Sequence, residues 1–349
     1  MSGVKHEVVL IGPDPNFPGG IESVIRNSLE FETSQFQIRN LVSWSPNSFL
    51  GITNWIQTLF IICRSLKKNK QMIIHCHIGK GGSWIREGSI ARFANLLRYR
   101  TVVTLHGSSL ENASADFLKF ISKVLELKEF SSVVTLTPST FTKLTPYCPN
   151  VILLPNPIST KMEIDNWKGQ ESRNVLFIGL IDTRKGVDLL LSAWEEISES
   201  HGNWSLTLIG PMGNMNLSAE SFSKMTNVCW LGECEPIVVS RYLGNCGFMV
   251  LPSLREQSPL VIWEAMHMGT PILATNLSGI EYQLGEDYPC LMEPGDTMGL
   301  KENLEKVITD KNLRNSMSLK SKLRSHVYLP HKITEQYLKI YRLAFQERS

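Results

Sequence analysis

The stretch "RNVLFIGLIDTRKGVDLLLSAWEEIS", residues 173–198, decides the fold. Its first part, 173–180, is a short apolar run ending in Gly-Leu, which is typical of a buried strand. Its second part, 186–198, is a helical run. A strand followed directly by a helix is the repeating unit of a parallel α/β sheet.

The same unit recurs on both sides of this stretch. Before it, strand-like runs at 7–13, 71–77, 100–107, 132–139 and 151–157 alternate with helix-compatible segments at 20–31, 52–68, 84–97 and 115–129. After it, strand-like runs stand at 204–211, 227–232, 246–253 and 270–275, with a helix between the last two. Strands that alternate with helices predict parallel, doubly wound sheets.

A polar segment divides the chain into two such series. The segment 157–172 starts with a proline, and the strand–helix pattern restarts after it. We therefore predict two Rossmann-like α/β domains at 1–158 and 159–329 that face each other across a cleft. A C-terminal helix is expected at 330–349, because apolar residues recur there at helical spacing after Pro330.

Length and composition narrow the class of protein. A chain of 349 residues suits two domains, and 42% hydrophobic with 19% charged residues is typical of a globular chain. The formal net charge of +2 argues against nucleic acid as a partner. Seven cysteines without zinc-finger spacing indicate reduced thiols in a cytoplasmic protein.

The sequence shows no signal-peptide core at its start and no apolar run of the length that a membrane span needs. The nearest candidate is 49–70, which ends in Lys67, Lys68 and Lys70. It has two interpretations, a core helix or a membrane-surface helix with a basic end. In the second case the basic side chains of Arg86, Arg92, Arg98 and Arg100 would support contact with a membrane.

In doubly wound sheets ligands bind outside the carboxyl ends of the strands, so residues of a ligand site are expected in the loops after the strands. Gly19 and Gly20 follow the first strand and precede a helix, where they favour either an anion at the helix end or a flexible turn. His106 follows the strand 100–105. Its side chain is suited to a hydroxyl or an oxyanion, and equally to a structural role.

Two cations follow the strand that starts at 173. Arg184 and Lys185 stand just before a helix N-terminus, where the helix dipole disfavours positive charge. This placement indicates either an anion bound between them and the helix or a solvated pair on a loop. Gly210 ends the next strand and is also a predicted donor-binding residue.

The stretch "LREQSPLVIWEAMHMGTP", residues 254–271, predicts a helix over 259–268. Ser258 suits the N-cap and Pro259 the first helical position. The free N–H groups of Leu260 and Val261, together with the dipole, form a site for a diphosphate.

Glu264 stands on this helix among apolar residues. A buried carboxylate needs hydrogen-bond donors, and ribose hydroxyls would supply them. Glu256 precedes the helix and would face the cleft near the other end of the diphosphate. One class of ligand satisfies all of these residues, a nucleotide diphosphate sugar.

The motif Glu256-x7-Glu264 followed by Ala-Met and Gly-Thr-Pro resembles the signature of retaining family-4 glycosyltransferases, which have the GT-B fold. "RKGVDLLLSAW", "LPNPI" and "SGIEYQLG" stand in the expected order, and 77–109 is similar to the same region of bacterial capsule and O-antigen enzymes. The resemblance covers most of the chain and is strongest over 173–296. It implies that the first domain binds the acceptor and that the C-terminal helix crosses back to it.

The resemblance also implies residue roles. Glu256, as a holder of sugar hydroxyls, and His106, near the 6-hydroxyl of the donor sugar, are the predicted catalytic residues. Gly20, Lys185 and the amide of Leu260 would contact the diphosphate, and Glu264 the ribose, with no metal or other cofactor. The sequence departs from the family at Leu180, where the family has a phosphate-binding arginine. We expect Arg184 to compensate for it from the same loop.

These observations predict a retaining transfer of sugar from a nucleotide diphosphate sugar to a hydroxyl of a growing, in some cases lipid-linked, glycan of a cell-surface polysaccharide such as capsule, O-antigen or lipopolysaccharide. The expected location is the cytoplasm, with the inner face of the membrane as an option. Two alternatives stay open, a sugar-nucleotide epimerase or hydrolase and a non-catalytic sugar-nucleotide-binding subunit. An NAD-dependent oxidoreductase is disfavoured, because no G-x-G-x-x-G follows the first strand.

Overall fold

The computed structural model describes residues 6–31, 33–45, 51–65, 72–159 and 166–346. Its contacts divide the chain into two compact units. Unit 1 comprises residues 1–160 and 330–349, and unit 2 comprises residues 161–329. The divisions predicted from the sequence lay after 158 and after 329. The cleft between the two domains stays a prediction.

Unit 1 is built on a six-stranded parallel sheet in the order β2-β1-β3-β4-β5-β6. Its strands are β1 (His6–Pro13), β2 (Phe36–Trp44), β3 (Met72–Ile78), β4 (Arg100–Leu105), β5 (Ser132–Thr135) and β6 (Val151–Leu153). Its α-helices are α1 (Gly20–Leu29), α2 (Gly51–Ser65), α3 (Ser83–Leu96), α4 (Ala115–Leu125), α5 (Pro138–Leu144) and α13 (Pro330–Gln346).

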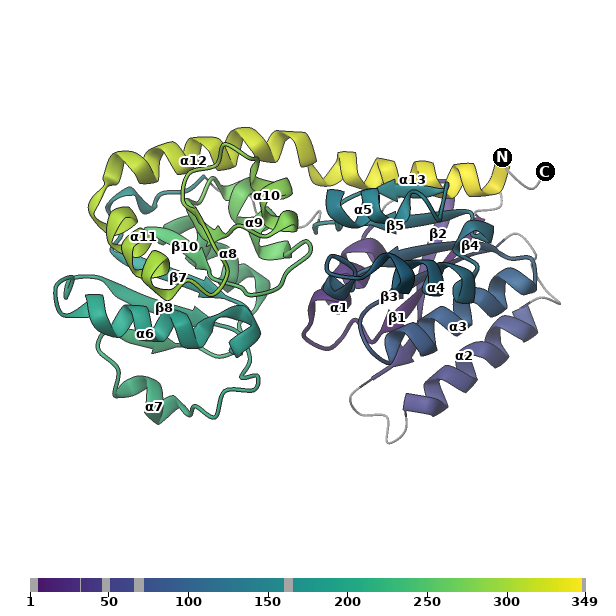
Figure 1. The fold of residues 1–349 in the computed structure, drawn as a ribbon, viewed down its shortest axis with the longest axis horizontal. Coiled ribbons are helices and arrows are strands. Elements are labelled where there is room, and N and C mark those ends of the chain that lie inside the picture. Colours follow the sequence, from purple (N-terminus) through teal and green to yellow (C-terminus); the bar gives the residue numbers. More distant parts are fainter. Residues whose placement is uncertain (1–5, 32, 46–50, 66–71, 160–165, 347–349) are drawn as a thin grey trace. The chain divides into compact units, whose positions relative to one another are not determined.

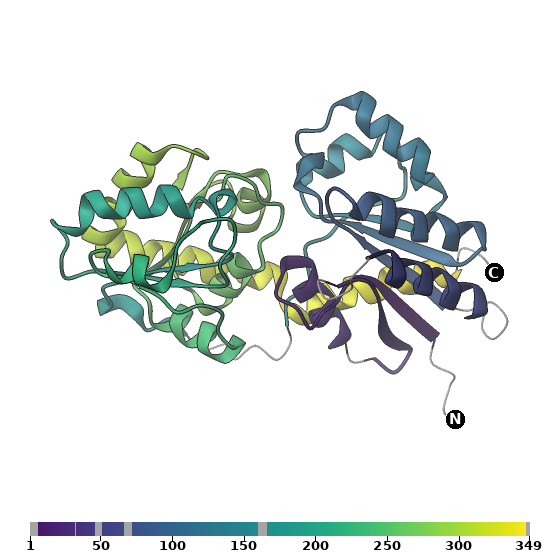
Figure 2. The same cartoon turned by 90° about the horizontal axis from the view of Figure 1, so that it is seen from below.

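The two faces of this sheet are filled by different helices, because successive side chains of a strand point to opposite faces. On one face, alternate residues such as Val9, Ile74 and Val103 join a hydrophobic cluster with buried side chains of α2, α3 and α4. On the other face, His75 of β3 contacts Tyr341 of α13. Figures 1 and 2 show α13 (yellow) beside the strands of unit 1, although it follows unit 2 in the sequence.

Helix α13 is held to unit 1 by apolar and polar contacts. Its Ile333, Tyr337 and Tyr341 are buried. The Tyr341 hydroxyl lies 2.8 Å from His75 Nδ1, and Tyr337 donates a hydrogen bond of 3.3 Å to the carbonyl of Pro155. Because these side chains fill one face of the sheet, the last helix of the chain belongs to the core of its first domain.

Unit 2 is built on a second six-stranded parallel sheet, in the order β12-β11-β10-β7-β8-β9. Its strands are β7 (Asn174–Ile178), β8 (Ser205–Ile209), β9 (Val228–Trp230), β10 (Phe248–Leu251), β11 (Ile272–Thr275) and β12 (Leu291–Met292). Its α-helices are α6 (Val187–Ser198), α7 (Ala219–Ser223), α8 (Pro236–Asn245), α9 (Leu260–Met268), α10 (Ser278–Leu284), α11 (Thr297–Thr309) and α12 (Lys311–Ser325). Helix α11 packs against α6, and α12 against α9 (Figure 1).

The strand order of unit 2 reverses between β7 and β10. From β7 the chain builds outward through β8 and β9, and it then returns to add β10, β11 and β12 on the other side. Such a reversal opens a crevice at the carboxyl edge of a doubly wound sheet. The loops that follow β7 and β10 flank it.

The predicted α/β class with two parallel, doubly wound sheets is confirmed. Helix α9 begins at Leu260, so the predicted start at Pro259 was one residue early. Strand β2 was missed. It is an edge strand in which polar residues such as Gln37, Arg39 and Asn40 interrupt the apolar pattern, and most of its side chains are only half-buried.

Candidate active site

The predicted residues of unit 2 gather in the two loops that flank its strand-order reversal. Arg184 and Lys185 lie in a 3₁₀ turn after β7, and Glu256 lies between β10 and α9. Since β7 and β10 are hydrogen-bonded neighbours in parallel orientation, their carboxyl ends bring these loops together. The place is where doubly wound sheets bind their ligands.

The carboxylate of Glu256 is buried and surrounded by cations. Lys185 Nζ forms an ion pair with Glu256 Oε1, and an Arg184 guanidinium nitrogen lies 3.8 Å from the same oxygen. The Ser253 hydroxyl donates a 3.3 Å hydrogen bond to it. We call Asp182, Arg184, Lys185, Ser253 and Glu256 the Lys185–Glu256 cluster.

The backbone fixes the two loops against each other. The amide of Leu254 donates a 2.9 Å hydrogen bond to the carbonyl of Arg184. Gly186, at φ 69°, sits so close to the Pro252 carbonyl that a Cβ would overlap its oxygen. Asp182 caps the turn by accepting from the Lys185 amide at 2.8 Å, and its other oxygen lies 3.7 Å from Arg184. Asp182 was not singled out from the sequence, although an Asp directly before a helical turn is a recognisable cap.

The start of α9 differs from the sequence prediction. The residue at the N-cap is Pro259, and among the described residues no side chain caps this helix end. The Ser258 hydroxyl instead accepts from Trp263 Nε1 and Gln283 Nε2, each at 3.4 Å. The prediction of Ser258 as N-cap was therefore wrong, because the indole and amide donors engage its oxygen. The first turn, from Leu260, keeps unsatisfied N–H groups and the positive end of the dipole.

Glu264 lies one turn further along α9. Its side chain is partly exposed, and no hydrogen bond or ion pair to it is found within the described part of the chain. Desolvation by its apolar surroundings raises its pKa from 4.5 to about 7. A carboxyl group without hydrogen-bond donors from the protein can accept hydrogen bonds from the hydroxyl groups of a ligand.

Gly210 has a packing role that the sequence did not reveal. It follows β8 at φ 139°, and a Cβ on it would overlap the carbonyl oxygen of Gly179, which follows β7. Its own carbonyl accepts a 2.9 Å hydrogen bond from Trp230 Nε1. The glycine pair therefore lets two adjacent loops approach each other. Leu180, where the family has arginine, comes directly after Gly179.

In unit 1, Gly19 and Gly20 lie where the sequence predicted, at the start of α1. Gly19 is the N-cap residue, and a Cβ on Gly20 would meet nothing within 4 Å. Glu22, in the first turn of the same helix, was not among the predicted site residues. Desolvation by burial raises the pKa of this carboxyl group. The helix end that was predicted to face a diphosphate therefore carries a carboxyl group of its own.

His106 follows β4 and is tied to two histidines of β3. Its Nε2 lies 3.0 Å from His77 Nδ1, and the two rings stack with centroids 5.2 Å apart. His77 in turn stacks on His75 at 4.5 Å. We call His75, His77 and His106 the imidazole stack. His75 and His77 are two residues apart on one strand, which is the spacing that places both on one face.

No group of three or more His, Cys, Asp or Glu side chains in the described ranges is arranged to hold a metal ion. No helix described by the structure is long and apolar enough to cross a membrane.

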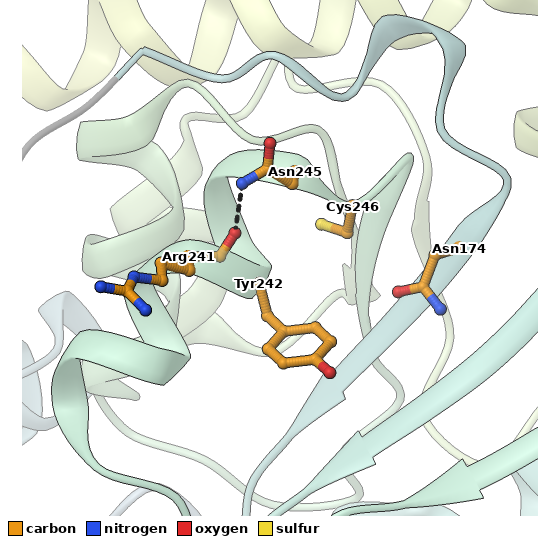
Figure 3. A pocket seen from close by; sticks show the side chains of 5 residues that line it. All are labelled: Asn174, Arg241, Tyr242, Asn245 and Cys246. Carbon is orange, nitrogen blue, oxygen red and sulfur yellow. Dashed lines mark hydrogen bonds between the residues drawn. The ribbon is translucent and has the colours of Figure 1, made fainter.

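A small pocket lies elsewhere on unit 2. It has a volume of about 280 Å³, and Figure 3 shows the side chains that line it, Asn174, Arg241, Tyr242, Asn245 and Cys246. Asn174 is the first residue of β7, and Cys246 comes just before β10. The pocket thus lies at the amino ends of these strands, and the Lys185–Glu256 cluster at their carboxyl ends.

Sequence comparisons identify relatives. The family model "Glycosyl transferases group 1" matches residues 160–324. An uncharacterised glycosyltransferase of Haemophilus influenzae is 28% identical over 63% of this chain and 64% of its own length. The capsular polysaccharide biosynthesis glycosyltransferase CapM of Staphylococcus aureus is 27% identical over 45% of this chain and 44% of its own length. The chain thus spans less than two thirds of the length of each of these relatives.

Structural comparison extends the likeness to both units. Sucrose-phosphate synthase from Thermosynechococcus elongatus superposes with a TM-score of 0.78 at 17% identity, over 98% of this chain and 100% of that one. HepE of Anabaena, in a crystal structure with UDP-glucose, gives a TM-score of 0.71 at 14% identity, over 96% and 100%. Residues 160–324 thus match a glycosyltransferase family, in agreement with the motif of Glu256 and Glu264, and both units have the GT-B fold of these solved structures.

Proposed function

We propose that this protein transfers a sugar from a nucleotide diphosphate sugar to a hydroxyl group of a growing glycan, with retention at the anomeric carbon. One observation carries the proposal. A pair of cations, an uncapped helix N-terminus and a carboxyl group without partners stand together at the strand-order reversal of unit 2.

The diphosphate would bind between the two loops. The first turn of α9 supplies N–H groups and the positive end of the dipole, and Lys185 and Arg184 supply charge. In the structure both cations form ion pairs with Glu256. Binding of a diphosphate would redistribute them between the phosphate oxygens and this carboxylate. In that role Arg184 would replace the phosphate-binding arginine of the family, whose position is occupied here by Leu180.

The nucleoside would bind one helical turn further along. Ribose hydroxyls would donate hydrogen bonds to Glu264. The pKa of this carboxyl group is raised by desolvation, and donors from a ligand would stabilise its charged form. Glu256 would accept hydroxyl groups of the sugar, and His106 of unit 1 would contact that sugar, as the family resemblance implies.

The chemistry follows from these roles. The acceptor oxygen forms a bond to the anomeric carbon on the face from which the diphosphate departs. The bond between that carbon and the phosphate oxygen breaks, and the leaving phosphate takes the proton of the acceptor hydroxyl. Lys185, Arg184 and the end of α9 stabilise the charge that develops on the leaving group. This mechanism needs no metal ion or other cofactor.

The comparisons support the choice of substrate class. HepE is described with UDP-glucose, and CapM with capsular polysaccharide biosynthesis. For this chain we infer a nucleoside diphosphate hexose as donor and a cell-surface polysaccharide, such as capsule, O-antigen or lipopolysaccharide, as product. The proposed location is the cytoplasm.

Contact with the inner face of the membrane is a further part of the proposal, since a lipid-linked acceptor would lie there. Helix α4 exposes Phe117, Phe120 and Val124 along one side, next to Lys119 and Lys123. An apolar stripe flanked by lysines suits a membrane surface. Flotation with anionic vesicles checks this contact, and Phe120→Glu is expected to weaken it.

The basic side chains named from the sequence give less support to such a contact. Arg92 donates a 2.6 Å hydrogen bond to the Val124 carbonyl, and Arg100 one of 2.9 Å to the Ala344 carbonyl, so both hold unit 1 together. Lys67, Lys68 and Lys70 lie outside the described residues.

The first experiment is a thermal-shift panel of nucleoside diphosphate sugars on the wild type and on Glu264→Ala. One base should raise the melting temperature of the wild type and not that of the variant. The donor found in this way is then incubated with glycan acceptors, and NMR of the product gives the anomeric configuration. An inverted anomer would exclude the mechanism, and turnover of the donor without acceptor would indicate a hydrolase or epimerase. Binding without any turnover would indicate a non-catalytic subunit.

A further inference from the structure

The hydrogen bond between His77 and His106 determines which proton His106 offers to a ligand. His77 Nδ1 lies 3.0 Å from His106 Nε2. One proton lies between two neutral imidazoles, so one ring donates and the other accepts. If His77 donates, His106 carries its own proton on Nδ1. If His106 donates, its Nδ1 is a bare acceptor.

Both rings are neutral. Burial lowers the pKa of His77 from 6.5 to about 3. Burial, and then the neighbouring His77, lower the pKa of His106 well below its usual value. The choice is therefore between two neutral tautomers of each ring.

The other nitrogen of His77 favours one of them. His77 Nε2 is buried and has no hydrogen-bond partner among the described residues. If His106 were the donor, this nitrogen would carry a buried N–H without an acceptor. If His77 is the donor, the nitrogen is a bare lone pair. Orphaned buried N–H groups are the rarer case in proteins.

For another buried histidine of this protein, His267, the contacts determine which nitrogen carries the proton. His267 Nδ1 lies 2.8 Å from the carbonyl oxygen of Trp263, which can only accept. His267 therefore donates from Nδ1. Burial lowers its pKa, and its Nε2 is likewise buried without a partner in the described structure. A neutral histidine that donates from Nδ1 and leaves a bare Nε2 is thus already accommodated in this fold.

We propose that His77 is a positioning residue that donates from Nδ1 to His106 Nε2 and so holds His106 in the tautomer with its proton on Nδ1. His106 is partly exposed and makes no other side-chain hydrogen bond in the described part of the chain. It therefore presents an N–H donor, suited to an oxygen atom of a ligand. Its only lone pair is engaged by His77, so it does not act as a general base.

The role of this donor rests on the proposed function, in which the oxygen belongs to the sugar of a nucleoside diphosphate sugar. The tautomer itself does not depend on that function. The two statements can therefore be tested separately.

The decisive measurement is a long-range ¹H–¹⁵N correlation NMR spectrum of the full chain labelled on histidine, at neutral pH. The two rings are assigned by the loss of their signals in His106→Gln and His77→Phe. We expect His106 and His77 to be protonated on Nδ1 and bare on Nε2. A proton on Nε2 of His106, or a charged ring, overturns the proposal whether or not any transfer activity is found.

Two substitutions of His77 then separate positioning from packing. In His77→Asn the side-chain amide nitrogen takes the place of Nδ1 and can still donate, whereas His77→Phe keeps a ring without a donor. We expect His106 to keep its Nδ1 tautomer in the Asn variant and to lose it in the Phe variant. With an active donor, kcat/KM should fall about tenfold in the Phe variant and stay near wild type in the Asn variant. Equal loss in both variants, with the Nδ1 tautomer unchanged, would show that His77 only packs.

Discussion

The Lys185–Glu256 cluster of unit 2 and the imidazole stack of unit 1 both contain buried ionisable side chains, but they stabilise these side chains in different ways. Each places ionisable side chains where water is largely excluded. In unit 2 the buried carboxyl group of Glu256 forms ion pairs with Lys185 and Arg184. In unit 1 the pKa values of His75, His77 and His106 are lowered by burial, and the rings are neutral. A site for a diphosphate needs charge, whereas a site for hydroxyl groups needs oriented dipoles.

Removing a cation from the cluster is expected to give the largest effect. In Lys185→Ala the developing charge of the leaving group loses the ammonium group proposed to stabilise it, and Glu256 keeps only Arg184 and the Ser253 hydroxyl as partners. We expect kcat to fall about 10³-fold. Lys224→Ala is the control, since Lys224 is an exposed lysine of the same unit paired with Glu220. Equal activity of the two variants would show that the cluster is only structural.

Neutralising Glu264 should weaken donor binding by about 10–100-fold, because hydrogen bonds from hydroxyl groups to a charged acceptor are lost. The measurement is titration calorimetry of Glu264→Gln with the donor and, as the control, with inorganic diphosphate. The donor should bind less tightly and the diphosphate unchanged. A parallel loss for both ligands would place Glu264 at the phosphates and not at the ribose.

The same substitution has a pH-dependent effect on the free protein. The folded protein holds the Glu264 proton up to a pKa of about 7, against 4.5 for the ordinary group. Ionisation therefore costs stability as the pH rises through this interval, and the full cost is present above it. We expect Glu264→Gln to raise the melting temperature by about 2–6 °C near pH 8.5 and to change it little near pH 5. The opposite order would mean that donors within the protein stabilise the carboxylate.

Unit 1 should respond to the loss of a neutral hydrogen bond by a smaller amount. In Tyr341→Phe the buried His75 Nδ1 loses its partner at 2.8 Å. The free energy of unfolding is expected to fall by about 1–3 kcal/mol, measured by urea denaturation. Tyr147→Phe is the control, because no hydrogen bond of this hydroxyl is found in the described structure. If both variants are equally stable, the network around His75 contributes little.

The smallest effect is expected from metal removal. The proposed mechanism relies on side-chain cations and a helix end, so EDTA should change the transfer rate by less than about twofold. The measurement is the initial rate after chelation and after addition of Mg²⁺ or Mn²⁺. A large loss of transfer rate that Mg²⁺ or Mn²⁺ reverses would show that a metal ion helps to stabilise the leaving group, and the mechanism would have to include it.

Elements with a strong pattern were predictable from sequence, among them the edge strands β6 and β9, whereas the edge strands β2 and β12 were missed. The apolar run 71–77 became β3 (Met72–Ile78), and 186–198 became α6 (Val187–Ser198). Edge strand β2 escaped prediction, because partly exposed strands mix polar with apolar residues. A periodic pattern shows that a side chain is buried, but it does not show what that side chain contacts.

Partners in the candidate site were the hardest to predict. Lys185 and Glu256 are far apart in the sequence and meet only because β7 and β10 are neighbours at the strand-order reversal. His77 was visible in the run 71–77, but its bond to His106 depends on the pairing of β3 with β4. Gly210 was predicted to bind the donor, and the structure shows its close approach to Gly179. Such contacts depend on topology, which a local motif does not contain.

Helix α13 has a consequence for the order of events during synthesis. Nascent domains generally fold from the N-terminus as they leave the ribosome. In this protein unit 1 cannot complete its core until α13 is made. The side chains of Ile333, Tyr337 and Tyr341 cover one face of its sheet, and they are synthesised after all of unit 2. Until translation reaches this helix, the His75 face lacks its cover. The second unit is continuous in sequence, so all of its residues are made before α13.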